Sequence, residues 1–395
     1  MHHSVFPIGV SLARPVLVRR AAALLFAFVL VLPVLLLSSS ARGTDVAAGD
    51  ITANTTWSRA GSPYYIRGNV RVAYNVTLSV EPGVDIRFAG NYSLSSFMGR
   101  IFANGTPAEP VTFAPAADNG RPWQWGSLDV RGIHDCRVTG AERVSVGGNY
   151  GSPSGVNRCS IDRTWNGLTI YASYAQRFEN VTLQQTVTTA LAIADVFNGT
   201  FSNITIDRAK FGIALVHVGH PDTGADPMGN SFSYLTVSNF TEGVRVNGGF
   251  PYPPPKTNLL TKSVFRDGGV TFPTSFSGKV YANNIAKTTG DFGFPTADGI
   301  GFYDDGSKGN HWSNYTGTDA NYDGIGDAPY GPDRYPLMDS VPDAGARPFN
   351  LAFVPSGGSS IGPLVVAFLI MVTVVPMIIV VLIGRRSKDP GRGVR

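Results

Sequence analysis

Two carboxylates, Asp162 and Asp207, are candidates for acid–base chemistry because they share one outward position of a repeated strand pattern. Gln184 holds that position in the repeat between them, which predicts two coils, or roughly 9.6 Å, between the carboxylates. This separation is near the upper end of the ~6.5–9.5 Å of an inverting glycosidase. No third carboxylate accompanies the pair in the sequence pattern. A solvated polar face is the better interpretation, and we expect no enzyme.

The same face carries groups suited to binding a glycan. Beside the carboxylates runs a second polar column, Arg163, Gln185 and Arg208. Three aromatic residues that could stack on sugar rings follow nearby in the sequence: Trp165, Tyr171 and Tyr174. The sequence therefore predicts a non-enzymatic module that binds carbohydrate or a surface protein. A carbohydrate-active hydrolase or lyase that uses Asp162 and Asp207 is the alternative.

The segment that begins at Asp319 has the spacing of a calcium-binding loop. Its candidate ligands are Asp319, Asn321, Asp323, the carbonyl of Ile325, and Asp327. The twelfth position is Tyr330 instead of a bidentate glutamate, so the loop is not a standard EF-hand. Asp333 could supply the missing carboxylate, or the loop is a turn without metal. Ca²⁺ is the candidate cofactor.

Two histidines and a methionine in a Gly/Pro-rich segment form a weaker metal candidate. His217, His220 and Met228 are residue types that bind copper. No third clear ligand accompanies the two histidines, so a polar surface loop is the simpler interpretation, and we do not expect copper.

Cys136 and Cys159 are 23 residues apart, which is one period of the repeat. Their shared parity predicts that they stack on adjacent strands about 4.8 Å apart. That spacing lies inside the Cα range of a disulfide. A disulfide and a pair of buried free thiols are both consistent with the sequence.

The carboxylate, polar and cysteine positions recur because the chain repeats a strand–turn–strand unit, which is clearest from Val156 to Val246. A small residue returns at Gly167, Ala190 and Gly212 about every 22–23 residues, and at Gly243 after a longer step. Short strands at a fixed period, without helical periodicity, indicate a solenoid whose coils must stack to bury their inner faces. We predict an all-β, right-handed parallel β-helix over residues 44–340.

Composition is consistent with this fold. The 395 residues include 46 Gly and 27 Pro, and only 15% are charged. The net charge of +4 is small and gives no reason to expect a nucleic-acid partner. We expect a monomer.

The two ends of the chain carry apolar runs. Residues 1–43 combine arginines, an apolar run and small residues, which predicts a signal peptide or signal anchor. Residues 361–384 form a longer apolar run that could span a membrane, and the basic tail 385–395 places the C-terminus in the cytoplasm. The Pro/Gly/Ser-rich residues 341–360 are typical of a stalk. We therefore predict a single-pass protein of the cell membrane with its β-helix outside.

A glycosylated surface protein is also consistent with the density of Asn-x-Ser/Thr sequons. They occur at Asn54, Asn75, Asn91, Asn104, Asn180, Asn198, Asn203, Asn239 and Asn314. Asparagine and threonine are common in β-helix turns, so composition explains some of these sequons.

The region of about 280–338 carries the most specific motif of the chain. Val280–Ile285 is followed by Asp305–Thr318, Asp319–Tyr330 and Asp333–Leu337. This segment resembles the closing cap of NosD-like β-helix proteins, a family named for a periplasmic copper-site maturation protein. Many membrane-anchored archaeal surface proteins share the motif. The resemblance implies a carbohydrate-binding or sugar-hydrolysing type of β-helix. It does not imply copper delivery, because proteins without a link to that pathway carry the motif, and copper binding or maturation is only a second alternative function.

Overall fold

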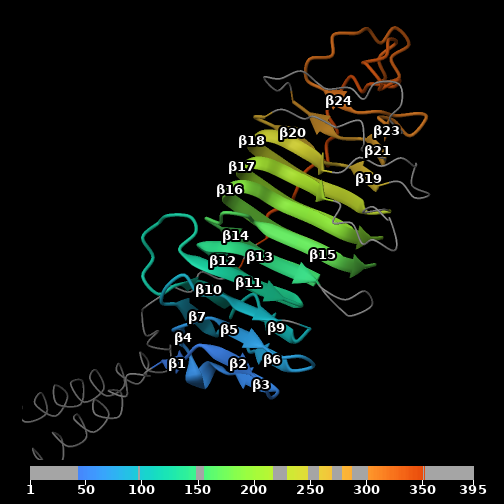
Figure 1. Cartoon of the computed structure of the whole chain (residues 1–395). Helices are drawn as coiled ribbons and strands as arrows, with labels where there is room; N and C mark the ends of the chain where they lie inside the picture. The colour runs from blue at the N-terminus through green and yellow to red at the C-terminus, as the bar shows by residue number, and fades with distance from the viewer. Residues whose placement is uncertain are drawn as a thin grey trace, which may run out of the picture. The chain divides into compact units, whose positions relative to one another are not determined.

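The computed structural model describes residues 43–96, 98–147, 155–216, 229–247, 258–268, 278–286, 301–349 and 351. Short strands wind through about nine turns of a right-handed parallel β-solenoid (Figure 1). Each strand pairs in parallel with the strand one coil further on, as β1 does with β4 and β4 with β7. The prediction of an all-β parallel β-helix is confirmed.

The opening coils contain β1 (Thr44–Val46), β2 (Gly49–Ile51), β3 (Thr55–Trp57), β4 (Tyr64–Ile66), β5 (Val70–Val72), β6 (Thr77–Val80), β7 (Asp85–Phe88), β8 (Leu94–Ser96) and β9 (Arg100–Asn104). The middle coils contain β10 (Val111–Pro115), β11 (Trp125–Val130), β12 (Gly132–Thr139), β13 (Ala141–Gly147), β14 (Gly155–Asp162), β15 (Leu168–Tyr174), β16 (Arg177–Phe197), β17 (Thr200–Val216) and β18 (Ser231–Asn247). The last coils contain β19 (Asn258–Thr261), β20 (Val264–Arg266), β21 (Gly278–Tyr281), β22 (Asn284–Ile285), β23 (Gly301–Phe302) and β24 (His311–Trp312). A 3-10 turn, η1, spans Arg59–Gly61.

The register of the middle coils follows the predicted period. We use the word column for residues that hold the same position in successive coils. One inward column runs Cys136, Cys159, Val181, Ile204 and Leu235, as the repeat predicts. Each coil up to Ile204 adds 22–23 residues, and the step from Ile204 to Leu235 is 31 residues, the longer step seen in the sequence.

The bends between the strands depend on a left-handed backbone conformation. Arg163, Gln185 and Arg208 have φ values of 54°, 52° and 61°, and they lie in one column. Such values are uncommon outside glycine. Here they turn the chain sharply between two faces of the solenoid, so the side chains of this column project from a corner.

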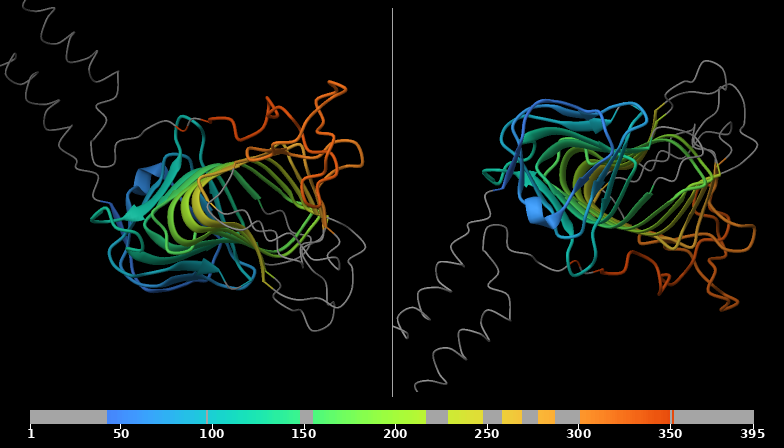
Figure 2. Two further views of the ribbon diagram at one scale, coloured as in Figure 1. Left: turned by 90° about the horizontal axis from the view of Figure 1, so that it is seen from above. Right: turned by 90° about the horizontal axis from the view of Figure 1, so that it is seen from below.

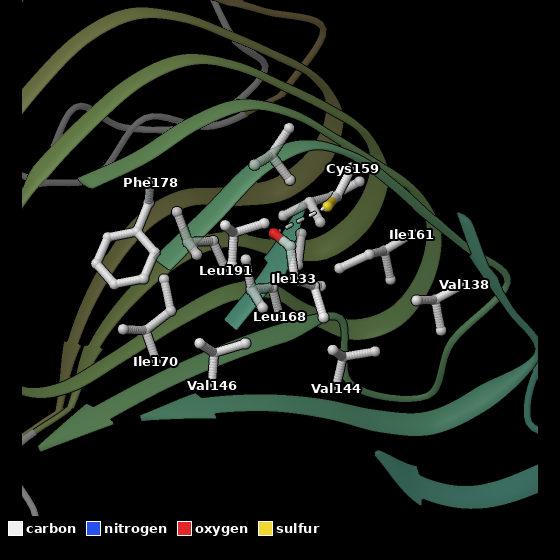
Figure 3. Close-up of a cluster of buried hydrophobic side chains, with 14 of the residues drawn as sticks. Ile133, Val138, Val144, Val146, Cys159, Ile161, Leu168, Ile170, Phe178 and Leu191 are labelled. Atoms are coloured by element: carbon white, nitrogen blue, oxygen red, sulfur yellow. Dashed lines mark hydrogen bonds between the residues drawn. The ribbon is translucent and has the colours of Figure 1, made fainter. Parts of the chain in front are cut away.

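The interior is filled by stacked aliphatic and aromatic side chains. Views along the stack show the strands enclosing a shared interior (Figure 2). Figure 3 shows the apolar side chains that meet there, with Phe178 at one side of the cluster. The rings of Phe178, Phe201 and Phe232 stack along the axis with centroids 5.0 and 4.8 Å apart. This spacing matches the step between strands, so each coil adds one ring.

The Cys136 column becomes polar in the last coils. After Leu235 it continues with Ser263, Asn283 and Asn310, all of them fully buried. Each backbone N–H donates to the side-chain oxygen of the next coil, from Leu235 to Ser263 and onward to Asn310. Asn310 in turn donates its backbone N–H to Asp333 at 2.8 Å. Buried hydrogen bonds thus replace aliphatic packing as the connection between these coils.

Residues 341–349 and 351, the first part of the segment expected to form a stalk, lie along the side of the solenoid. Val341 exchanges two hydrogen bonds with the side chain of Asn284, at 2.7 and 2.9 Å. Three further contacts follow in order toward the N-terminal coils: Ala346 N–H to Thr236 Oγ1, Arg347 N–H to Asn203 Oδ1, and the Arg137 guanidinium to the Leu351 carbonyl. We call these residues the strap. Its linker-like composition did not predict this course, because side chains of the coils supply the partners.

The strap is expected to loosen when Asn284 is replaced by alanine. Asn284→Ala removes both hydrogen bonds to Val341, which should cost about 1–2 kcal/mol of local stability. Hydrogen exchange of the strap amides should then accelerate by roughly 5–30-fold. Asn91→Ala, at an exposed position away from the strap, is the control. Unchanged exchange in Asn284→Ala would show that these bonds do not hold the strap.

The predicted targeting and anchoring segments lie outside the described residues, apart from Gly43. This applies to 1–42, to the predicted span 361–384 and to the tail 385–395. Within the part of the chain that the structure describes, no helix has the length and apolar character needed to cross a membrane.

Candidate ligand-binding face

Two half-exposed tryptophans, Trp123 and Trp165, lie side by side on the surface of the middle coils. Their ring centroids are 5.4 Å apart, with 51° between the ring planes. The exposed fractions are 47% for Trp123 and 40% for Trp165, which are high for so large an apolar side chain. Exposed indole rings offer flat apolar surfaces to a ligand.

A segment between β10 and β11 carries Trp123 to this position. The guanidinium of Arg163 donates two hydrogen bonds to the carboxylate of Asp118, at 2.8 and 2.6 Å. The Gln124 side chain also donates to Asp118, at 2.8 Å. The N–H of Trp123 then bonds the carbonyl of Arg163 at 3.3 Å. Arg163 therefore orders the loop that supplies one tryptophan, and the corner that follows Arg163 supplies the other.

The charged side chains at this corner form ion pairs between carboxylates and arginines. The hydrogen bonds from Arg163, the largest influence, hold the pKa of Asp118 well below its usual range. Arg163 also donates to Asp162 at 3.1 Å, and Arg208 donates to Asp207 at 2.9 Å. Arg163 thus lies beside both Asp118 and Asp162, and Arg208 lies beside Asp207.

Asp162 and Asp207 lie in one column with Gln184 between them, as predicted. Burial alone would raise the pKa of Asp207, but hydrogen bonds from Asn239, Arg208 and Ser238 outweigh it and lower that pKa. A carboxyl with a lowered pKa is poorly suited to donate a proton as a general acid. The column is better suited to forming hydrogen bonds with a ligand.

The other predicted aromatic residues differ in their exposure. Tyr174 is 51% exposed at the end of β15. Tyr171 is partly buried opposite Gly147, and burial raises the pKa of its phenol. The structure therefore makes Trp123, and not Tyr171, the observed ring partner of Trp165.

The candidate calcium loop is closed by its own hydrogen bonds. Asp319 accepts from the backbone N–H groups of Asp323 and Gly324, and Asp323 accepts from Ile325. Asp327 accepts from Thr318 and Ala320, and Asn321 donates to Asp323. Among the described residues no group of three or more His, Cys, Asp or Glu is arranged to hold a metal ion. Calcium binding stays a prediction.

Asp333 does not join the candidate calcium loop. It is fully buried and accepts hydrogen bonds from Asn310, Trp312 and Tyr335. In this structure its oxygens satisfy donors inside the cap, and the alternative in which it supplies the missing carboxylate stays a prediction. The copper candidates His217, His220 and Met228 lie outside the described residues.

Cys136 and Cys159 face each other on paired strands and are both buried, free thiols in this structure. Burial raises the pKa of the Cys136 thiol, so it is unreactive as a nucleophile. The register on which the disulfide prediction depends is present, and the disulfide itself stays a prediction.

The sequons differ in accessibility. Asn54, Asn75, Asn91, Asn104 and Asn239 are exposed. Asn180 and Asn203 instead join a ladder in which Asn203 donates to Asn180, and Asn180 to Asn157, at 2.6 and 2.9 Å. Asn198 and Asn314 are half-buried. Glycosylation stays a prediction, and the exposed sequons are its better candidates.

Comparisons with protein-family models, curated proteins and solved structures find no match. The proposed function therefore depends on the geometry of this face. Sequence reasoning identified Trp165 but missed Trp123 and Asp118, which no periodic signal connects to it. The one available signal was an aromatic and acidic loop interrupting the strands between Pro115 and Trp125.

Proposed function

We propose that the protein is a non-enzymatic surface module that binds a glycan on the face formed by Trp123, Trp165 and the adjoining Asp–Arg pairs. The tryptophan pair carries the proposal, because exposed indole rings stack on the apolar faces of sugars. The neighbouring Asp162, Gln184 and Asp207 column supplies fixed hydrogen-bonding groups. Aromatic surface beside oriented polar groups is the usual composition of a ligand site.

The proposed setting is the outer face of a cell membrane, with residues 361–384 as the anchor. The β-helix fold is compatible with this role and also with hydrolase or lyase activity. Asp162 and Asp207 each lie beside an arginine, which favours binding over proton transfer. The resemblance of residues 280–338 to a NosD-like cap supports the same placement, and a Ca²⁺ ion in the loop at Asp319 would be structural.

Titration calorimetry with a panel of neutral and acidic oligosaccharides tests this function. Trp165→Ala should weaken binding about tenfold, as expected from the loss of ~1.4 kcal/mol. Tyr322→Ala is the matched control, because Tyr322 is an exposed aromatic residue (91%) in the candidate calcium loop. Equal binding by Trp165→Ala would contradict the proposal. Release of reducing ends or unsaturated sugars would favour the hydrolase or lyase, and binding of a protein alone would favour a protein receptor.

A further inference from the structure

The tryptophan pair lies at one end of a strip of corner residues that follows the solenoid axis. Val187 is 38% exposed, and its N–H bonds the carbonyl of Thr164, directly beside Trp165 in the next coil. The following coil contributes Lys210, whose ammonium lies 5.1 Å from the centroid of the Phe211 ring. Thr186 pairs with Ala209 and Thr189 with Phe211, so a β-bulge sets Val187 and Thr188 against the single residue Lys210 at this corner. We call Trp123, Trp165, Val187 and Lys210 with Phe211 the corner strip.

The corner strip repeats with the spacing of the coils, about 4.8 Å per step. One step is comparable to the length of one sugar residue in an extended chain. A glycan that lay along the axis would therefore meet Val187 one coil beyond Trp165, and Lys210 one coil further. A glycan that crossed the axis would reach only the tryptophan pair.

The ion-paired side chains beside the corner strip, taken together with Lys210 of the strip itself, balance in charge. Asp118 and Asp162 share Arg163, and Asp207 pairs with Arg208. Lys210 supplies the third positive charge against three carboxylates. Gln185, exposed between Arg163 and Arg208, is neutral. An acidic sugar would have to compete with carboxylates already bound to these guanidinium groups, whereas neutral hydroxyls can add to the pairs.

We infer that the ligand is an extended, neutral polysaccharide that lies along the solenoid axis. Its sugar rings stack successively on the corner strip, and its hydroxyls bond the column that contains Gln185 and Arg208. This inference rests on the proposed function and adds the direction, length and charge class of the ligand. It also makes Val187 a residue that distinguishes long ligands from short ones.

Calorimetry with size-graded oligosaccharides tests the inference. The neutral probes are cello-, malto- and β-1,4-manno-oligosaccharides of two to six residues, and oligogalacturonides of the same lengths are the acidic probes. Affinity for one neutral series should rise by tenfold or more from two to four residues. Val187→Asp should abolish this gain. Val187→Thr, which keeps the shape without the charge, controls for folding.

The outcomes distinguish failure of the polysaccharide inference from failure of the proposed glycan-binding function. Tryptophan-dependent binding with no gain from length, or a preference for oligogalacturonides, would overturn the inference and leave the glycan-binding function standing. An intact length gain in Val187→Asp would also overturn it. If none of the neutral or acidic probes binds, both the inference and the glycan-binding function fail.

Discussion

Phe201→Ala is expected to destabilise the middle coils more than any other single truncation of the stacked phenylalanines. Phe201 is fully buried, and its ring lies between those of Phe178 and Phe232. Truncating a buried phenylalanine leaves a cavity and costs about 3–5 kcal/mol. The loss of two stacked neighbours adds to that cost, since each aromatic pair contributes about 0.5–1.5 kcal/mol beyond burial.

Hydrogen exchange resolved along the chain is the suitable measurement. Coils of a solenoid contact only their neighbours, so the effect should be confined near the cavity. Amides of β16, β17 and β18 should lose protection, while those of β1 to β9 keep it. Tyr174→Ala removes an aromatic ring that is 51% exposed and should change stability by less than about 0.5 kcal/mol. A loss below about 1 kcal/mol in Phe201→Ala would mean that the surrounding coils collapse into the space.

The regular part of the fold could be predicted because each coil repeats the offset of the last. The position of Cys159 beneath Val181 and the alignment of Asp162 with Gln184 both follow from one period of about 22–23 residues. The same argument placed Arg163 beside the carboxylates. What a periodic pattern specifies is which residues share a column and which face they occupy.

Features that depend on single side-chain contacts were not predictable in this way. Trp123 reaches Trp165 because Arg163 binds Asp118, which is 45 positions earlier in the sequence. Asp118 and Trp123 lie in a segment that does not follow the repeat. The strap follows the coils because Asn284 and Thr236 happen to offer partners to its backbone. In both cases the decisive interaction joins a regular coil to an irregular segment. The irregular segment has no repeated sequence pattern from which its position could be predicted.

Asp333→Ala is expected to disrupt the cap that closes the solenoid. Asp333 accepts hydrogen bonds from the Trp312 indole at 2.7 Å and from the backbone N–H groups of Asn310 and Tyr335 at 2.8 and 3.1 Å. Alanine leaves all three donors buried without this acceptor, at about 1 kcal/mol or more each. The cap should lose at least about 3 kcal/mol of stability. Hydrogen exchange of the cap amides reports the change, because five tryptophans share the fluorescence signal, and Asp339→Ala at an exposed position is the control.

The same carboxyl should make the stability of the cap fall as pH rises. Burial raises the pKa of Asp333 in the folded state, although its hydrogen bonds partly oppose that shift. Below the unfolded pKa, about 3.9, both states hold the proton and this group does not disfavour folding. Above that value the unfolded state releases its proton first, so stability declines until the pH passes the raised folded pKa. Asp333→Asn, which cannot titrate, should lack this decline.

Asp304, in the same cap, should change stability with pH in the opposite direction. Burial alone would raise the pKa of Asp304, but hydrogen bonds from Arg334 and from backbone N–H groups lower it. Its contribution to the stability of the cap is therefore present above the pKa of the unfolded state. It is lost as the pH falls through the lower pKa of the folded state. Comparing Asp304→Asn with Asp333→Asn between about pH 3 and pH 7 separates the two carboxyls. A decline with rising pH that persisted in Asp333→Asn would assign the effect to another group and remove Asp333 as its source.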